Sequence, residues 1–306
     1  MTSSIDFKGR VAIVTGAGGG LGRQHALALA ARGAKVLVND LGGARDGSGG
    51  SVSAAQAVVD EILAAGGEAL ANGASVTDAA AVEAMVQQAV DAWGRVDVLV
   101  NNAGILRDKS FAKMDLAGFR LVLDVHLMGA VHCTHAVWPH MTAQKYGRIV
   151  MTTSSSGLYG NFGQSNYGAA KMALVGLMQT LSIEGAKHDI GVNCLAPTAA
   201  TRMTEDLMPQ AVLDALTPES VVPAMLVLAA QDAPNRTILC AGAGSFEAAH
   251  VTLTQGIFVG AVADAPEQLA ARLAEVTARD GDQVPQSGAA QGTLEVGKAA
   301  AAATTR

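Results

Sequence analysis

The sequence predicts an α/β fold in which helices cover both faces of a doubly wound, mostly parallel sheet. Short apolar segments rich in β-branched residues alternate along the chain with longer segments whose apolar residues recur at helical spacing. Such alternation is typical of parallel strands joined by helical crossovers. A glycine-rich turn also lies between the first apolar segment and the first helical one. Together these observations predict a Rossmann-type sheet.

The predicted strands are short apolar segments without the alternating pattern of a half-exposed strand. Their sequences are VAIVT, KVLVN, VDVLVNN, GRIVMT and IGVNCLA, at 11–15, 35–39, 96–102, 147–152 and 190–196. RTILCAG at 236–242 is expected to complete the sheet. Because both sides of these segments are apolar, we expect both faces of the sheet to be covered.

The segments between the strands have helical spacing. They span 21–32, 52–65, 78–92, 115–144 and 165–187, with a later one near 218–230. The second and third end at glycines, which commonly terminate a helix. The long helices 115–144 and 165–187 are apolar around more of their circumference than one sheet face can cover. We therefore expect a homodimer or homotetramer built on them.

The domain organisation follows from where the strand-helix alternation stops. One Rossmann-type domain is expected over residues 1–245. Residues 246–285, which show helical spacing at 266–279, are expected to form an extension packed on that domain. The segment 286–306 has low complexity and is expected to be a mobile tail.

Composition limits the kinds of partner and location. Half of the 306 residues are apolar, and the formal net charge is −6 with no basic block, so a small molecule is expected rather than nucleic acid or an anionic membrane. Three widely spaced cysteines suggest neither a disulfide framework nor a zinc site. The amino terminus lacks an apolar signal core, and no uninterrupted apolar run approaches about 18 residues. A cytoplasmic protein without a membrane span is expected.

The first candidate site is the glycine-rich turn TGAGGGLGRQHA at 15–26. It places Gly16, Gly20 and Gly22 where the first strand turns into a helix. Glycine there allows positive φ and close backbone approach, which leaves amides at the helix amino terminus free to bind a pyrophosphate. The pattern is TGxxxGxG, because Leu21 occupies the last glycine position of the commoner GxGxxG form. The alternative is a flexible hairpin.

Asp40 favours the nucleotide-binding interpretation. It stands at the end of the second strand, about twenty residues after the glycine turn, where a carboxylate accepts hydrogen bonds from an adenosine ribose. The same carboxylate would repel a 2′-phosphate, so NAD is predicted rather than NADP. Taken alone, Asp40 could equally be a turn residue before the following LGG.

The second candidate site contains a phenol, an ammonium and a hydroxyl. Tyr167 and Lys171 are one helical turn apart, and Ser154 follows the predicted strand at 147–152. A phenol is a poor base at its ordinary pKa of about 10, and a nearby ammonium lowers that pKa. We expect Lys171 and a bound nicotinamide to supply this charge. Tyr167 would then take the proton of an alcohol as hydride leaves its carbon, while Ser154 holds the substrate oxygen.

Each of these three residues also has a structural alternative. A tyrosine and a lysine four residues apart are common on helices, and the serine could merely cap a turn. In combination with the glycine turn, catalysis is the leading hypothesis.

The motifs together resemble the short-chain dehydrogenase/reductase family over about residues 8–245. They are TGAGGGLG at 15–22, NNAG at 101–104, Ser154 and YGAAK at 167–171, in order and at matching distances. The resemblance implies that Ser154, Tyr167 and Lys171 are catalytic. The cofactor contacts that it implies are Gly16, Gly20, Leu21, Gly22, Asp40, Ser75, Val76, Asn102, Ala103, Gly104, Tyr167, Lys171, Pro197 and Thr198.

Three positions depart from the family pattern. Ser75 replaces a more usual aspartate beside the adenine, and Thr198 replaces the glycine that usually follows Pro197. His126 stands where many members carry an asparagine that completes a proton relay through water to the lysine. The relay could therefore run through an imidazole or differ altogether.

Longer stretches are similar to the 3-hydroxyacyl-CoA dehydrogenase domain of peroxisomal multifunctional enzymes of type 2 and their bacterial single-domain relatives. They are VNDLGG at 38–43, NNAGILRDKSFAKM at 101–114, VHLMGA at 125–130, QKYGRIVMTTSSSGLYGNFGQSNYGAAK at 144–171 and TRMT at 201–204. This similarity implies NAD-dependent oxidation of a 3-hydroxyacyl-CoA, from a fatty or sterol side chain, to the 3-ketoacyl-CoA. A 17β-hydroxysteroid dehydrogenase is the alternative among enzymes. A non-catalytic NAD-binding sensor is the alternative of another class.

Substrate contacts are expected in the loops that follow the strands. Arg107 and Lys109 could pair with CoA phosphates, although a solvated loop is the slightly favoured alternative. Residues expected to line an apolar channel for the acyl group are Leu158, Tyr159, Phe162 and Met203. Histidines 126, 132, 135 and 140 crowd one helix without a ligand-spaced carboxylate or cysteine pattern, so no metal site is predicted.

Overall fold

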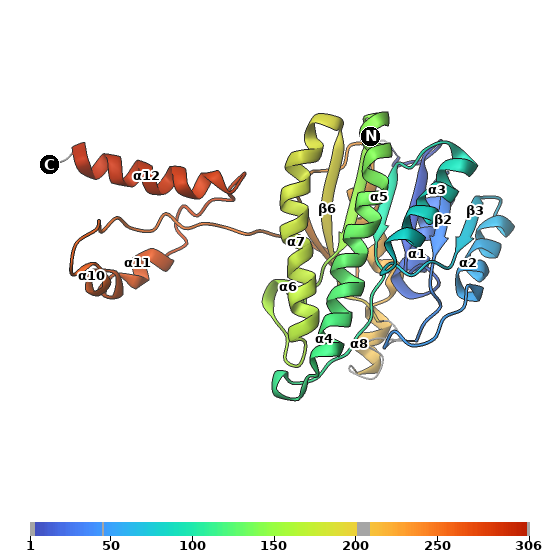
Figure 1. Ribbon diagram of the computed structural model, residues 1–306, viewed down its shortest axis with the longest axis horizontal. Coiled ribbons are helices and arrows are strands. Elements are labelled where there is room, and N and C mark those ends of the chain that lie inside the picture. Colours follow the sequence, from blue (N-terminus) through green and yellow to red (C-terminus); the bar gives the residue numbers. More distant parts are fainter. Residues whose placement is uncertain (1–3, 45, 201–208, 305–306) are drawn as a thin grey trace. The chain divides into compact units, whose positions relative to one another are not determined.

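The computed structural model describes residues 4–44, 46–200 and 209–304. They divide into two compact units, one ending at Ala248 and the other beginning at Ala249. The first unit contains the strands and helices predicted for the Rossmann-type domain. The second contains the carboxyl-terminal helices (Figure 1).

An eight-stranded sheet forms the centre of the first unit, in the order β3-β2-β1-β4-β5-β6-β7-β8. Its strands are β1 (Val11–Thr15), β2 (Lys35–Asn39), β3 (Glu68–Asn72), β4 (Val98–Asn101), β5 (Gly147–Thr152), β6 (Ile190–Pro197), β7 (Ile238–Gly242) and β8 (Ser245–Ala249). All pairs from β3 through to β7 are parallel. The chain starts in the middle of the sheet and winds to one side and then to the other. The predicted doubly wound fold is confirmed.

Helices cover both faces of this sheet (Figure 1). Those of the first unit are α1 (Gly20–Ala31), α2 (Ser53–Ala64), α3 (Ala79–Trp93), α4 (Leu116–Leu123), α5 (Gly129–Gln144), α6 (Ser155–Tyr159), α7 (Ser165–Gly185), α8 (Gln210–Ala215) and α9 (Val222–Ala229). On one face α1 packs beside α2 and α9, and on the other α5 packs on α3 while α4 packs on α7. The largest apolar cluster joins α1, α2 and α9 to the strands.

The ends of the helices follow local chemistry. Asp78 caps α3 by accepting a hydrogen bond of 3.1 Å from the Ala81 amide, and Gly94 ends that helix with a φ of 78°. Both features are typical helix boundaries. The predicted helix 115–144 is divided, because residues Asp124–Met128 form a π-helix between α4 and α5. This irregular turn contains His126.

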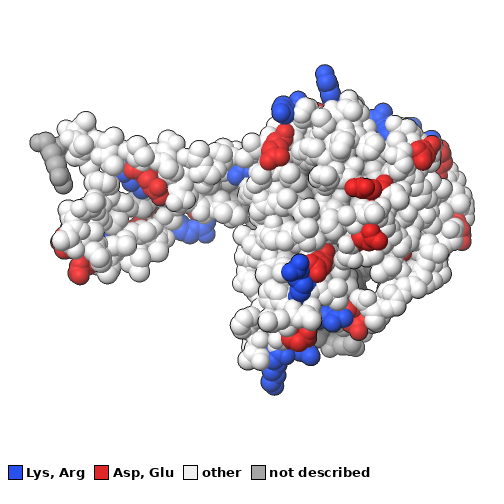
Figure 2. Space-filling view, viewed as in Figure 1, with Lys and Arg blue, Asp and Glu red and all other residues white. Residues whose placement is uncertain are grey.

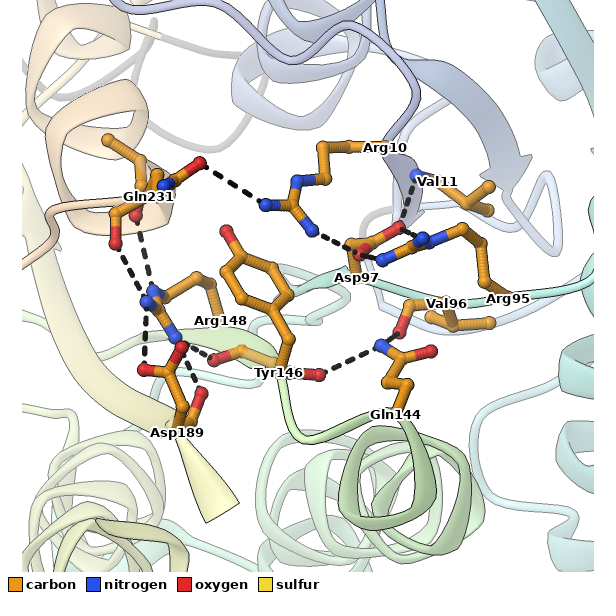
Figure 3. A network of polar contacts seen from close by, with 12 residues as sticks. Arg10, Val11, Arg95, Val96, Asp97, Gln144, Tyr146, Arg148, Asp189 and Gln231 are labelled. Atoms are coloured by element: carbon orange, nitrogen blue, oxygen red, sulfur yellow. Dashed lines mark hydrogen bonds and ion pairs between the residues drawn. The ribbon is translucent and has the colours of Figure 1, made fainter. Parts of the chain in front are cut away.

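The amino-terminal ends of the strands are fixed by a polar network (Figure 3). Asp97 is fully buried and accepts hydrogen bonds from Arg10 at 3.0 Å and from Arg95 at 2.5 Å. The ring of Tyr146 lies close to two guanidinium groups. The Cζ atom of Arg10 is 3.8 Å from the centre of the ring, and the Cζ atom of Arg148 is 4.3 Å from it. The pairing offsets the cost of burying the carboxylate. This end of the sheet is therefore closed by structural contacts.

The helical stretch Leu116–Gln144 is long and apolar enough, with a mean hydropathy of 1.3, to cross a membrane. In α5, however, Cys133, Val137 and Met141 are fully buried within the first unit. Core helices of soluble proteins also pass this length and hydropathy criterion, so the stretch is weak evidence for a span.

The surface of the first unit carries mixed charges. On the face shown in Figure 2, Lys and Arg side chains are interspersed with Asp and Glu, and most of the surface is uncharged. This distribution agrees with a net charge of only −6 and with the lack of a basic block in the sequence.

The second unit consists of α10 (Ala265–Ala271), α11 (Leu273–Thr277), α12 (Ala289–Thr304) and a bridge between Leu253 and Gln283. Within residues 249–304, no side chain is buried. Helix α12 occupies most of the segment that was expected to be a tail, because its run of alanines has high helix propensity. Packing of 246–285 on the first domain stays a prediction.

Candidate functional site

The candidate site lies at the carboxyl ends of the central strands. Thr15 ends β1, Asn101 ends β4 and Thr152 ends β5. β1 and β4 are neighbours although their connections run to opposite sides of the sheet. In doubly wound folds this switch in strand order opens a crevice in which ligands bind.

The glycine turn has the close backbone packing that its sequence predicts. Gly16 and Gly20 have φ values of 62° and 52°, which favour glycine. A Cβ added to Gly22 would lie 2.2 Å from the Gly16 carbonyl oxygen, so no larger residue fits there without displacing backbone. No side chain caps α1 at Gly19, which leaves the amides of the first turn available to an anion.

Asn102 holds this turn in place. Its side-chain amide donates hydrogen bonds of 3.0 Å to the carbonyls of Thr15 and Gly16. The Thr15 hydroxyl in turn accepts hydrogen bonds of 3.1 Å from the amides of Asn102 and Ala103. Asn102 was expected beside the adenosine and ribose, and the structure gives its side chain a bracing role between β1 and β4.

Asp40 is fixed at the rim of the turn. Its two carboxylate oxygens accept hydrogen bonds from the amides of Gly18 and Gly42, at 2.7 and 2.6 Å. A Cβ on Gly18 would lie 2.9 Å from this carboxylate, so Gly18 also requires its small size. Each oxygen of Asp40 retains a lone pair for a ribose hydroxyl. The turn, the free amides and this carboxylate together fit an adenine dinucleotide.

The loop expected beside the adenine is held by a residue that sequence reasoning missed. The Val76 carbonyl lies 2.9 Å from Nδ1 of His132 on α5, which must donate this hydrogen bond. A Cβ on Gly129 would lie 2.6 Å from the Val76 side chain, so the glycine allows α5 to approach the loop. The Ser75 hydroxyl, at the usual aspartate position, is 2.8 Å from that of Thr77.

Ser154 and Tyr167 meet at the end of β5. Ser154 is 8% exposed, and its hydroxyl accepts a hydrogen bond of 3.2 Å from the Ser156 amide at the start of α6. The same hydroxyl hydrogen-bonds Tyr167. Burial raises the pKa of Tyr167, the bond from Ser154 opposes this, and the charge of Asp108 adds to it.

Lys171 lies behind the tyrosine ring. Its side chain is buried, its Nζ donates a 2.5 Å hydrogen bond to the Thr152 carbonyl, and it lies 5.4 Å from the centre of the Tyr167 ring. Burial lowers the pKa of Lys171 to about 7. The expected lowering of the Tyr167 pKa is therefore not found in the free protein, because burial disfavours the charged form of both groups.

His126 occupies the asparagine position and faces the same site. Nε2 of its ring lies 2.8 Å from the Ile105 carbonyl and 3.1 Å from the Ile105 amide. The ring meets that of Tyr167 edge to face, 5.2 Å away. Burial, aided by the charge of Lys171, lowers the pKa of His126 to about 3, so the imidazole is neutral.

A small cavity separates His126 from the lysine. Its volume is about 10 Å³, and Thr15, Asn101, His126 and Lys171 contribute to its lining. This is about the space that one water requires. Among the described residues, Nδ1 of His126 has no hydrogen-bond partner.

Of the residues expected to contact substrate, Arg107 and Lys109 lie on the loop after β4, Leu158 and Tyr159 lie on α6, and Phe162 lies between α6 and α7. Arg107 donates a 3.0 Å hydrogen bond to the Asp46 carbonyl, and Lys109 is exposed. Tyr159 and Phe162 are 71% and 90% exposed, while Leu158 is half-buried. Met203 lies outside the described residues.

Two further cofactor contacts are expected at the end of β6. Pro197 is the last residue of β6, and the Thr198 amide donates a 2.8 Å hydrogen bond to the Ala241 carbonyl. In the described ranges, no group of three or more histidine, cysteine or acidic side chains could hold a metal ion. Two of the crowded histidines, 126 and 132, are bound to backbone instead.

Comparison with known proteins identifies the family of the chain. The family model described as short chain dehydrogenase matches residues 10–211. The peroxisomal hydratase-dehydrogenase-epimerase of Saccharomyces cerevisiae is 56% identical over 228 residues, which are 74% of this chain and 25% of that protein. A putative short-chain type dehydrogenase/reductase of Mycobacterium tuberculosis is 49% identical over 279 residues, 90% of this chain and 96% of that protein. The chain thus spans about a quarter of the yeast relative.

Solved structures show the same fold. Full-length peroxisomal multifunctional enzyme type 2 of Drosophila melanogaster superposes with a TM-score of 0.78 and 40% identity, over 95% of this chain and 49% of that one. A 7α-hydroxysteroid dehydrogenase complexed with NADH and 7-oxo glycochenodeoxycholic acid superposes with a TM-score of 0.71 and 29% identity, over 80% of this chain and 98% of that one.

Proposed function

The chain belongs to the short-chain dehydrogenase family, and we propose that it oxidises 3-hydroxyacyl-CoA esters to 3-ketoacyl-CoA esters with NAD. The observation that carries the proposal is the meeting of Ser154, Tyr167 and Lys171 at one end of the sheet, beside a glycine turn shaped for a dinucleotide. The name of the yeast relative, a peroxisomal hydratase-dehydrogenase-epimerase, supports a dehydrogenase, and the hydroxyacyl substrate is what the resemblance of the longer sequence stretches implies.

The preference for NAD rests on Asp40. Its carboxylate is held toward the glycine turn by two backbone amides, in a position to accept a ribose hydroxyl and to repel a phosphate. The NADH-bound hydroxysteroid dehydrogenase supports a nicotinamide cofactor in this fold. When bound, the nicotinamide would accept the hydride from the substrate carbon.

Tyr167 would take the hydroxyl proton of the substrate. Because burial raises its pKa, the free protein keeps it as a phenol, and it needs nearby positive charge to ionise. Lys171, with a pKa near 7, carries part of that charge at neutral pH, and the positive nicotinamide would add to it. Ser154 would hydrogen-bond the substrate oxygen and align it with Tyr167.

His126 would complete the path for the proton. Its ring is anchored to the Ile105 backbone, and both His126 and Lys171 line the cavity that has room for one water. Among the described residues, Nδ1 of His126 is left without a partner and is thus available to such a water. A water in that cavity could pass the proton from the lysine side of the site. In this role a neutral imidazole serves as well as the usual asparagine, because it presents one ring nitrogen to the backbone and the other to water.

The loops around Tyr167 favour a bulky substrate. Tyr159 and Phe162 expose apolar surface there, and Arg107 and Lys109 stand on the neighbouring loop. An acyl chain would pack on Tyr159 and Phe162. The CoA phosphates would pair with Arg107 and Lys109. The 7α-hydroxysteroid dehydrogenase among the solved structures supports a steroid alcohol as the second candidate substrate, and the 17β position is what the resemblance to relatives implies.

We also propose a homodimer or homotetramer. On α7 the exposed side chains include Met172 and Ile183, which are 41% and 51% exposed, and Leu116 on α4 is 79% exposed. Apolar surface of this kind on long helices suits a second copy of the chain. A cytoplasmic location remains the expectation.

Steady-state kinetics test the proposed function. We would measure kcat/KM for 3-hydroxyacyl-CoA esters and for free 17β-hydroxysteroids, each with NAD and with NADP. A clear preference for the CoA ester with NAD supports the proposal, and comparable efficiency on the free steroid would remove the argument for CoA. Replacing Arg107 and Lys109 by alanine should raise the KM for the ester only. A protein that binds NAD but turns over neither class would be a sensor.

A further inference from the structure

Two loops that flank Tyr167 are joined by a set of hydrogen bonds outside the catalytic triad. One loop follows β4 and contains Asp108, and the other precedes α7 and contains Gln164. The Gln164 side-chain amide donates a 2.7 Å hydrogen bond to the Asp108 carboxylate. The Lys109 amide also donates a 2.9 Å hydrogen bond to the Gly163 carbonyl. The two loops therefore act as one unit.

The contacts continue from Gln164 to the catalytic serine. The side-chain oxygen of Gln164, Oε1, accepts a 2.7 Å hydrogen bond from the Ser156 hydroxyl and one of 3.0 Å from the Asn161 side-chain amide. The Ser156 amide donates to the hydroxyl of Ser154, which itself hydrogen-bonds Tyr167. Asp108 is thus connected to the Tyr167 phenol through the side chains of Gln164, Ser156 and Ser154. Within Ser156 the connection passes from the hydroxyl to the backbone amide.

A second contact holds the same loops from the buried side. Asn166 is fully buried; its side-chain amide donates a 3.0 Å hydrogen bond to the Arg107 carbonyl, and its side-chain oxygen accepts one of 2.7 Å from the Tyr167 amide. The start of α7 is therefore fixed to the loop after β4 from two sides.

We propose that Asp108 and Gln164 form a positioning pair that clasps the loop after β4 to the start of α7 and so orients Ser154 and Tyr167. The inference rests on the proposed function, since it assigns these residues to the same reaction. Neither residue need touch the reacting atoms. Their influence would pass through Ser156 and through the placement of the helix start.

Asp108 should also act on Tyr167 through its charge. The groups that face Tyr167 are Ser154 from the end of β5, Lys171 from α7, His126 from the π-helix and Asp108 from the loop after β4. Of these, Asp108 is the carboxylate, and its charge raises the pKa of Tyr167. Because Asp108 is exposed, this effect should weaken at high salt.

Two variants separate the charge from the clasp. Asp108→Asn removes the charge but keeps an oxygen that can accept from Gln164, whereas Gln164→Ala keeps the charge and removes the clasp. The matched control is Asp91→Asn, because Asp91 on α3 accepts an equivalent 2.7 Å hydrogen bond from Gln87 on an exposed surface. Circular dichroism would verify that all three variants fold. If Gln164→Ala does not fold, Gln164→Met offers a bulkier replacement.

The pH dependence of kcat/KM for oxidation is the main measurement. Removing the Asp108 charge makes the Tyr167 phenolate easier to form, so the acid limb of the Asp108→Asn profile should move to lower pH, and less so in high salt. Gln164→Ala should lower kcat by about tenfold or more with little movement of the profile, because orientation is lost. Unchanged kcat in Gln164→Ala, or an unmoved profile in Asp108→Asn, would overturn the inference.

Titration of Tyr167 itself makes the test independent of the substrate. Absorbance changes on raising pH would be recorded with NAD present, and those of the Tyr167→Phe variant subtracted. A midpoint that falls in Asp108→Asn but not in Asp91→Asn supports the pair even if no hydroxyacyl-CoA is oxidised. Equal midpoints in all proteins would count against it, whatever the enzyme's substrate.

Discussion

Replacing Gly22 by alanine should weaken NAD binding strongly while leaving most of the fold intact. The added Cβ would lie 2.2 Å from the Gly16 carbonyl oxygen and 2.5 Å from Nδ2 of Asn102. Both neighbours are fixed, because that amide donates hydrogen bonds to the Thr15 and Gly16 carbonyls. The methyl group must therefore push the backbone of the turn away from α1.

The magnitude follows from the cost of overpacking. Inserting a methyl group into a closely packed site costs about 1–3 kcal/mol. If NAD must restore the native turn in order to bind, that cost appears in the affinity, and Kd rises roughly 5-fold to 150-fold. Any part of this cost that the free protein already bears lowers its free energy of unfolding instead of its affinity for NAD.

Calorimetric titration with NAD measures this effect directly. The control is Gly297→Ala on α12, where an added Cβ meets nothing within 4 Å and a small gain in helix stability is expected. Its Kd for NAD should equal that of the unchanged protein. A Gly22→Ala protein that binds NAD with unchanged affinity would refute the assignment of this turn to the dinucleotide.

Three further outcomes are expected. Asp40→Ala should weaken NAD binding about tenfold or more, because the amides of Gly18 and Gly42 lose a charged partner. The variant should also narrow the preference for NAD over NADP, and fluorescence titration with both cofactors measures both effects. Burial lowers the pKa of His25 to about 4. The contribution of the neutral imidazole to the free energy of unfolding, about 3 kcal/mol, is therefore present above pH 6.5 and is lost as pH falls through about 4. His25→Leu should flatten that loss in urea unfolding at several pH values, and an unchanged slope would contradict it. Light scattering at micromolar concentration should give at least twice the chain mass; the mass of a single chain would contradict the oligomer.

Most of the sheet could be predicted because its strands are buried on both faces. Segments such as VAIVT and GRIVMT have no other stable place than the middle of a covered sheet. β3 was missed, because EALAN lies at the edge, buries one of its five residues and begins with a charged side chain. An edge strand depends on its neighbour's backbone rather than on its own apolar pattern.

The meeting of Ser154, Tyr167 and Lys171 could be predicted, but not the energetics of these side chains. Spacing placed Tyr167 and Lys171 on one helix, yet it could not show how deeply both are buried, and burial reverses the expected pKa shift of the tyrosine. The π-helix around His126 and the contact of His132 with Val76 arise from packing between distant segments. No local pattern in the chain encodes them.

The central claim is that Tyr167 transfers the proton while NAD accepts the hydride, and Tyr167→Phe tests it most directly. The variant loses only a hydroxyl group, so it should bind NAD with nearly the affinity of the unchanged protein. Formation of NADH from a 3-hydroxyacyl-CoA, followed by its absorbance, should fall by a factor of about 100 or more. Normal NADH formation by Tyr167→Phe would contradict the mechanism.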